Sequence, residues 1–151
     1  MERIFITGIC GFVGSNLANY FLASGYKVYG IDNLSRKGSE KNFKTLKNLG
    51  VIIYTKDLTK LKNIKIFKKN MFFNGFIHCA ALTSVLDGTN KNSTDFLYKN
   101  NFLSTLQSLA ICKEIKSKFI YISSSRVYSI SSLNKLKLGT KKNSFYLKKN
   151  K

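Results

Sequence analysis

The sequence predicts an α/β fold in which a doubly wound parallel sheet is covered by helices on both faces. Short apolar segments alternate with longer amphipathic segments over the first 130 residues. The apolar segments do not alternate with polar residues, which is typical of strands buried on both faces. The segments between them are long enough for crossover helices, whose connections are right-handed. With 151 residues, of which 44% are hydrophobic, the chain can form one packed core.

The first part of this pattern is a strand, a helix and a second strand. Residues 3–7 (RIFIT) form a short apolar segment that is typical of a buried parallel strand. A helix is expected from Gly11 onward, with Gly25 as its C-cap. Residues 27–32 (KVYGID) form the second strand.

The remaining pattern supplies further strands and helices as far as about residue 130. The expected strands are residues 51–54, 73–80 and 119–124, and the expected helices are residues 40–49, about 61–69 and 95–116, the last with Phe102, Leu106, Leu109 and Ile111 facing inward. Residues 131–151 are rich in Ser, Lys and Asn, have weak periodicity, and are interpreted as a lysine-rich loop or tail. The sequence therefore predicts one domain over residues 1–130.

A glycine-rich turn, GICGFVG, joins the first strand to the first helix. Gly8 permits a tight turn, Gly11 removes a side chain that would keep the backbone away from a pyrophosphate, and Gly14 lets the helix pack close to the strand. The N–H groups and the dipole at the helix start attract a diphosphate. The turn predicts a dinucleotide-binding βαβ unit; a strand–turn–helix that happens to be rich in glycine is the alternative.

The nature of the dinucleotide depends on Asp32, which ends the second strand. A carboxylate at this position accepts hydrogen bonds from both hydroxyls of a ribose and repels a 2′-phosphate. Asp32 therefore predicts NAD as the cofactor. Arg36 and Lys37 follow closely and could host the additional phosphate, so NADP is the alternative.

The formal net charge of +19 suggests a basic nucleic-acid-binding protein as a competing function. However, only three of the 26 basic residues are arginine, and the lysines are spread along the whole chain. Specific recognition of phosphates and bases favours the guanidinium fork of arginine. We therefore interpret the lysines as a solvated surface, and nucleic-acid binding stays the weaker alternative.

The cysteines and the hydropathy pattern indicate a cytoplasmic protein. Cys10, Cys79 and Cys112 are an odd number of thiols in apolar surroundings, without the spacing of metal ligands. Such cysteines are typical of a reducing compartment. No membrane helix and no signal peptide are expected, because the apolar segments are short and the chain begins directly with a strand. We expect neither a metal nor a membrane partner.

These motifs together resemble the NAD-dependent epimerase/dehydratase family of the extended short-chain dehydrogenases/reductases, which bind their cofactor on a Rossmann-type sheet. TGICGFVGSNLA resembles the family's opening, and DNLSRKG resembles the loop after its second strand. This loop and SSRVYS are most like the sugar-nucleotide epimerases of the CDP-paratose 2-epimerase type. The resemblance implies that the cofactor is bound by Gly8, Gly11, Phe12, Val13, Gly14, Asp32, Asn33, Ser35 and Arg36.

Further motifs of the family follow in the same order along the chain. Asp57-Leu58 resembles the pair that holds the adenine, and HCAALTSV resembles the segment below the nicotinamide-side ribose. The resemblance implies that this segment places Ala80, Ala81 and Leu82 against the cofactor. We give the histidine that opens the segment no catalytic role. Asn101 matches an asparagine that kinks a helix near the active site and is implied to be part of the cofactor site.

The catalytic groups are only partly present. Ser124 stands where the family has its catalytic Ser or Thr, and its hydroxyl would bond the reacting oxygen of the sugar. A serine that merely caps the end of a strand is the alternative. The family also uses a Tyr and a Lys four residues apart, and this sequence has no YxxxK: Tyr146 is followed by Asn150 at that distance.

The resemblance implies an NAD-dependent sugar-nucleotide epimerase or dehydratase that acts on a CDP- or UDP-sugar by transient oxidation. The chain corresponds to its cofactor-binding half and lacks the substrate domain, so we expect no turnover from it alone. A non-catalytic NAD-binding module is the alternative. Because a sheet cut short would expose its edge, we expect low solubility, a homodimer, or a complementing C-terminal fragment.

Overall fold

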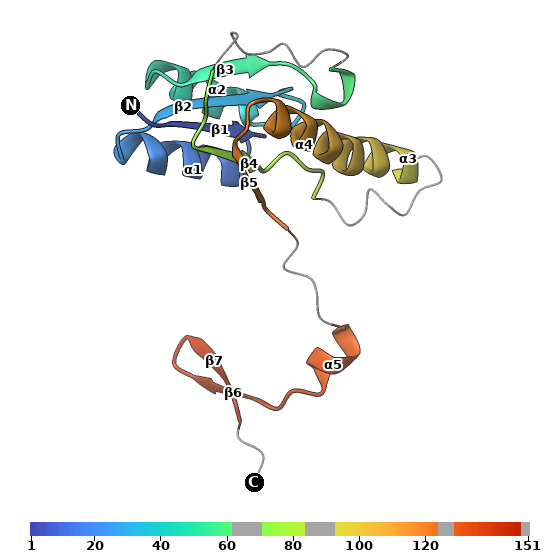
Figure 1. The fold of residues 1–151 in the computed structure, drawn as a ribbon. Coiled ribbons are helices and arrows are strands. Elements are labelled where there is room, and N and C mark those ends of the chain that lie inside the picture. The colour runs from blue at the N-terminus through green and yellow to red at the C-terminus, as the bar shows by residue number, and fades with distance from the viewer. Residues whose placement is uncertain (62–70, 84–92, 124–128, 149–151) are drawn as a thin grey trace.

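A computed structural model describes residues 1–61, 71–83, 93–123 and 129–148 (Figure 1). Its core is a parallel sheet with the strand order β3-β2-β1-β4-β5. The strands are β1 (Arg3–Thr7), β2 (Lys27–Asp32), β3 (Ile52–Thr55), β4 (Gly75–His78) and β5 (Lys118–Tyr121). The main helices are α1 (Phe12–Ala23), α2 (Ser39–Asn48) and α4 (Ser104–Glu114). This arrangement confirms the predicted fold class.

The sheet has an apolar layer on each face because successive residues of a strand point to opposite sides. On one face, Ile4 and Ile6 of β1 belong to the same buried cluster as Ala18 of α1 and Leu46 of α2. On the other face, Phe5 is fully buried in the cluster that also contains residues of α4. The central strand β1 therefore holds both layers together. None of the helices in the described ranges is long and apolar enough to cross a membrane.

Most predicted boundaries in the first half of the chain are within two residues of the structure. Strand β2 has the predicted limits, and α1 ends at Ala23. Gly25 follows in the left-handed region at φ +82°, a conformation that glycine adopts readily after a helix. The short 3-10 helix η1 (Leu58–Lys60) comes after β3. The helix predicted at about 61–69 lies almost wholly outside the described residues.

The long helix predicted at 95–116 differs from the structure. It is divided into α3 (Ser93–Leu97), a π-helical segment η3 (Tyr98–Leu103) and α4.

The predicted inward face of this helix was also wrong, except at Ile111. Phe102, Leu106 and Leu109 are 49%, 46% and 44% exposed, whereas Ser104 and Ser108 are buried. The physical reason at Ser108 is a histidine on β4, His78, which is buried beneath α4 and requires polar neighbours. The Ser104 hydroxyl instead donates to the carbonyl oxygen of Asn100 in the preceding turn.

The segment interpreted as a loop or tail contains regular structure. A short helix α5 (Ile130–Asn134) precedes β6 (Leu138–Lys141) and β7 (Ser144–Leu147), which pair antiparallel. Lys142 adopts φ +51° in the connecting turn, and the ring of Tyr146 packs over Gly139, where a side chain would collide with it. Turn geometry and one aromatic–glycine contact thus form a hairpin without an apolar repeat.

We predict that Phe5→Ala lowers the free energy of unfolding by about 3–5 kcal/mol, because it leaves a cavity between well-packed aromatic rings. The Phe5 ring lies 5.6 Å from that of Phe73 and 5.1 Å from that of Phe76. Phe145, which is 76% exposed, provides the matched control: Phe145→Ala is expected to change stability by less than about 0.5 kcal/mol. Urea unfolding followed by circular dichroism measures both. Equal losses for the two variants would contradict this description of the core.

Candidate dinucleotide-binding site

The candidate site lies where the carboxyl ends of β1, β2 and β4 meet at one edge of the sheet. Strand β1 is in the middle of this group, because it pairs with β2 on one side and with β4 on the other. Ligands of doubly wound sheets bind at this edge. The loops that follow these strands contain most of the residues that the sequence predicts as cofactor ligands.

The glycine turn after β1 is compact because backbone approaches backbone. Gly8 has φ +63°, and its N–H donates to the carbonyl oxygen of Ile31 at 2.8 Å. A Cβ atom on Gly8 would lie 2.8 Å from the backbone of Ala80, and one on Gly14 would collide with the Gly8 carbonyl. At Gly11, a Cβ atom would meet only the Gly8 carbonyl oxygen, at 3.2 Å. Gly8 and Gly14 therefore form the turn, and Gly11 leaves its outer side open.

The first turn of α1 presents backbone N–H groups without a side-chain cap. Its N-cap is Gly11, and the turn has no acidic residue. Phe12 and Val13 are 82% and 42% exposed, so the turn is accessible from solvent. The free N–H groups of a helix start carry a partial positive charge. This turn can bind the oxygens of an anion.

Asp32 connects this turn to the loop after β2. Its Oδ2 accepts from the N–H of Cys10 at 2.9 Å, and its Oδ1 accepts from the N–H of Leu34 at 2.9 Å. Because a carboxylate has about four acceptor sites, it retains capacity for two hydroxyl donors. Burial and the charge of Asp32 raise the pKa of the Cys10 thiol to about 12. Burial therefore keeps the Cys10 thiol protonated, as expected of a packing residue.

Hydrogen bonds also order the loop after β2 and connect helix α2 to the glycine turn. The Asn33 Oδ1 accepts from the N–H of Ser35 at 3.1 Å, and Ser35 is exposed. Arg36 donates from Nη2 to the hydroxyl of Thr83 at 2.8 Å. The Asn42 side chain of α2 donates to the Cys10 carbonyl at 2.8 Å. Sequence reasoning missed Asn42, which belongs to no local motif, and Thr83, which lies in the HCAALTSV segment but was given no role.

Asp57 and Leu58 have local structural partners. The Asp57 Oδ1 accepts from the N–H of Thr59 at 2.9 Å and from its hydroxyl at 2.7 Å, so Asp57 caps η1. Leu58 is 6% exposed and belongs to the core. Their contact with an adenine stays a prediction.

The segment after β4 is held at its start by Thr7, the last residue of β1. The Thr7 hydroxyl oxygen accepts from the N–H groups of Cys79 and Ala80, at 3.2 Å each. The same oxygen lies 2.7 Å from Nδ1 of His78. The hydroxyl of Ser108 on α4 lies 3.0 Å from the same Nδ1, so two hydroxyl groups meet this ring nitrogen.

The hydrogen bonds continue from His78 into the helix above. The His78 Nε2 lies 3.1 Å from the hydroxyl of Thr105, which donates to the Asn101 carbonyl at 2.6 Å. The Asn101 side chain accepts from the Leu82 N–H at 2.7 Å and donates to the Leu82 carbonyl at 3.1 Å. The segment with Ala80, Ala81 and Leu82 is thus fixed at both ends, by Thr7 and by Asn101.

We call the hydrogen-bonded series from Thr7 through His78 and Thr105 to Asn101 the polar line. The sequence contained one signal for it. Polar residues recur at helical spacing, at Asn101, Ser104, Thr105 and Ser108, beside the apolar residues that we took as the buried face. Asn101 lies within the π-helical segment η3, where the helix departs from regular geometry.

The structure brings together the glycine turn, Asp32 and the Ala80–Leu82 segment. Ser124 lies outside the described residues, and the structure therefore gives no geometry for a catalytic group. In the described part of the chain, His, Cys, Asp and Glu side chains do not gather into a group of three that could hold a metal ion.

Comparison with known proteins shows which proteins the chain is similar to. The model of the NAD dependent epimerase/dehydratase family matches residues 4–146. The chain is 33% identical over 130 residues to CDP-paratose 2-epimerase of Salmonella typhi, covering 83% of this chain and 38% of the relative. It is 35% identical over 133 residues to dTDP-D-glucose 4,6-dehydratase of Dictyostelium discoideum, covering 85% and 30%.

Solved structures give the same result. A UDP-glucuronic acid 4-epimerase mutant from Bacillus cereus, in complex with a fluorinated UDP-sugar and NAD, matches with a TM-score of 0.73 and 30% identity, over 84% of this chain and 41% of that one. The UDP-glucose 4-epimerase of Bifidobacterium longum, in complex with NAD+ and UDP, matches with a TM-score of 0.70 and 27% identity, over 84% and 38%. The chain thus spans well under half the length of these relatives.

We predict that His78 stays neutral down to about pH 4, because burial lowers its pKa to about 4. In the unfolded chain a histidine titrates near 6.5. Between these values the unfolded state takes up a proton that the folded state resists, so stability is full above about pH 6.5 and decreases as the pH falls toward 4. His78 is the only histidine in the sequence, and an NMR titration of its ring signal measures the pKa directly.

The variant His78→Gln provides the control, because it keeps the acidic residues that titrate in the same range. The wild-type unfolding midpoint is expected to decrease more steeply than that of the variant between pH 6.5 and 4.5. A ring pKa near the ordinary value of 6.5, together with parallel stability curves, would show that the hydrogen-bonded line does not hold a neutral imidazole.

Proposed function

Because the chain belongs to the NAD dependent epimerase/dehydratase family, we propose that it binds NAD and is the cofactor-binding half of a sugar-nucleotide epimerase or dehydratase. The observation that carries this proposal is the position of Asp32. Its carboxylate is fixed at the end of β2 by the N–H groups of Cys10 and Leu34, directly beside the glycine turn. A ribose acceptor and a diphosphate cradle are thus adjacent.

The residues of the site fit NAD. The missing side chain of Gly11 and the uncapped first turn of α1 suit a diphosphate, since a side chain at Gly11 would extend from the open side of the turn. Asp32 would accept from the adenosine ribose, and its negative charge disfavours the 2′-phosphate of NADP. The segment from Ala80 to Leu82 would support the nicotinamide-side ribose. When bound, NAD supplies a reversible hydride acceptor.

For the whole enzyme we propose a nucleoside diphosphate sugar as substrate, with a CDP- or UDP-sugar as the first candidates. The relatives named above carry CDP-, dTDP- or UDP-linked sugars in their names. Ser124 would hold the reacting sugar oxygen. No tyrosine of this sequence has a lysine four residues after it. We therefore propose that this chain binds NAD but does not turn over CDP- or UDP-sugars by itself.

Two further proposals concern the binding partner of the chain and its cellular compartment. Ile120 and Tyr121 on the edge strand β5 are 50% and 53% exposed, and Phe102 and Leu106 are exposed on the helix beside it. We propose that a second copy or a complementing C-terminal fragment covers this surface. All three cysteines are free thiols, which suits the cytoplasm.

We predict that the chain binds NAD more tightly than NADP, and that Gly11→Ala weakens NAD binding by at least about tenfold without unfolding the domain. Gly11 has φ −73° and ψ 174°, a conformation that alanine adopts, so its methyl group affects the ligand more than the fold. Isothermal titration calorimetry with the 151-residue chain measures these affinities.

Gly25→Asn is the matched control, since Gly25 lies at the far end of α1, where a Cβ atom would have no neighbour within 4 Å, and asparagine tolerates its positive φ. This variant is expected to bind NAD like the wild type. A wild-type chain that ignores NAD but binds DNA with a steep salt dependence would replace this proposal with the nucleic-acid alternative.

A further inference from the structure

Arg36 reaches across the site from one loop to another. Its guanidinium Nη2 donates to the hydroxyl of Thr83 at 2.8 Å, although Arg36 follows β2 and Thr83 follows β4. Strand β1 lies between these two strands, and the glycine turn is at its end. The Arg36 side chain therefore joins the loops on either side of the strand that leads into the glycine turn.

We propose that Arg36 is the cation that binds the diphosphate of the dinucleotide, and that Thr83 holds its guanidinium over the glycine turn before the ligand binds. This inference rests on the proposed function, because it assumes that a dinucleotide occupies the turn. It is more specific than the role implied by the sequence, which named Arg36 as one of the residues that bind the cofactor.

The charges around the turn favour such a cation. A diphosphate has two negative charges, and the start of α1 compensates only about half an elementary charge. Asp32 adds another negative charge, since its Oδ2 lies 2.9 Å from the N–H of Cys10 within the turn. The first turn of α1, which contains Phe12, Val13 and Gly14, has no basic side chain. A cation on a neighbouring loop would therefore strengthen the binding of a diphosphate.

The guanidinium of Arg36 is suited to this task. It has five N–H donors, and the bond to Thr83 uses one of them. Two parallel donors match the oxygens of a phosphate group, which a lysine ammonium cannot imitate. Because Arg36 is exposed, exchanging its bond to the Thr83 hydroxyl for a charged partner requires no rearrangement of the core.

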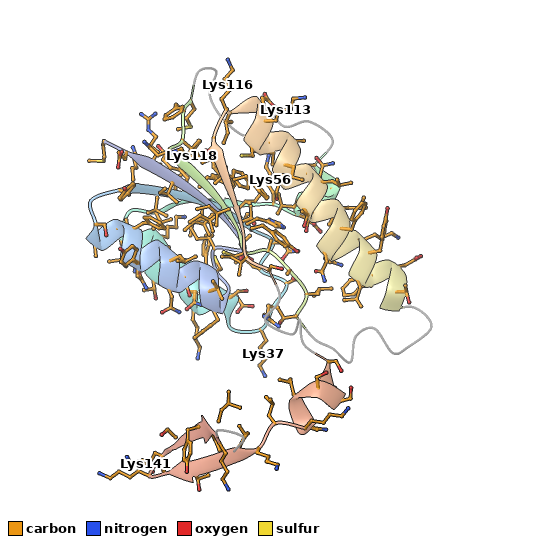
Figure 2. All side chains as sticks on the ribbon, turned by 60° about the horizontal axis from the view of Figure 1, so that its bottom comes forward. Lys37, Lys56, Lys113, Lys116, Lys118 and Lys141 are labelled. Carbon is orange, nitrogen blue, oxygen red and sulfur yellow. The ribbon has the colours of Figure 1, made fainter. Side chains whose placement is uncertain are left out.

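Other cations near the sheet are placed less favourably. Lys37, the next residue of the same loop, points away from the sheet (Figure 2). Lys56 follows β3, and its N–H donates to the Asp32 carbonyl at 3.1 Å, so β2 separates it from the glycine turn. Lys113, Lys116 and Lys118 gather where α4 leads into β5, at the opposite end of the sheet (Figure 2). Lys56 is therefore the best control for a general effect of charge at the correct edge.

The test compares ligands that contain or lack the diphosphate. Calorimetric titrations with NAD, ADP-ribose and adenosine are made on the wild-type chain and on Arg36→Gln, Arg36→Lys and Lys56→Gln. Arg36→Gln is expected to lower the affinity for NAD and for ADP-ribose by at least about tenfold, and to leave the affinity for adenosine within about twofold of the wild type. Arg36→Lys is expected to restore part of the loss, and Lys56→Gln to stay within about threefold of the wild type for all ligands.

The other possible results contradict either the role of Arg36 or the proposed function. An equal loss of adenosine affinity in Arg36→Gln would place Arg36 at the ribose or adenine instead. An unchanged affinity for NAD in this variant, or an equal loss in Lys56→Gln, would remove its special role while leaving the proposed function intact. A wild-type chain that binds neither NAD nor ADP-ribose would overturn both proposals. Thermal unfolding by circular dichroism confirms that each variant is folded.

Discussion

The structure depends on the close approach of three backbone segments at the glycine turn. Gly14 places the start of α1 directly on the Gly8 carbonyl, and Gly8 places the turn against the backbone of Ala80 after β4. Any side chain at Gly8 or Gly14 would separate these segments. Because they stay together, the helix start, the acid at the end of β2 and the segment after β4 converge around one short stretch of chain.

A polar line inside the domain supports this arrangement from behind. Thr7, His78 and Thr105 link the end of β1 to the helix that carries Asn101, whose side chain holds Leu82. Such a line requires polar residues at a helix–sheet contact, where apolar residues are the rule. Its cost is limited, because every buried side-chain nitrogen and oxygen in the described ranges has a hydrogen-bond partner.

The sequence predicted the parts of the fold and the site that depend on residues close together along the chain. The glycine turn and Asp32 could be recognised because steric space and a ribose acceptor are required at fixed positions after two strands. The buried face of the long helix was predicted wrongly although polar residues recur along it at helical spacing, because His78, which Thr105 and Ser108 contact, is distant in sequence. The direction of Arg36 depends on Thr83, and the hairpin depends on a contact between Tyr146 and Gly139; neither pair forms a pattern along the chain.

The central claim is that the edge of the sheet at the end of β1 is a dinucleotide site. The most direct test is to follow the backbone amide resonances of the isotopically labelled chain during an NMR titration with NAD. We expect the largest shifts at Gly8, at residues 11–14, at Leu34 and at residues 80–82, and no shifts in the hairpin of β6 and β7. Shifts confined to the lysine-rich end around Lys113, Lys116 and Lys118, or no saturable shifts at the glycine turn, would contradict this account.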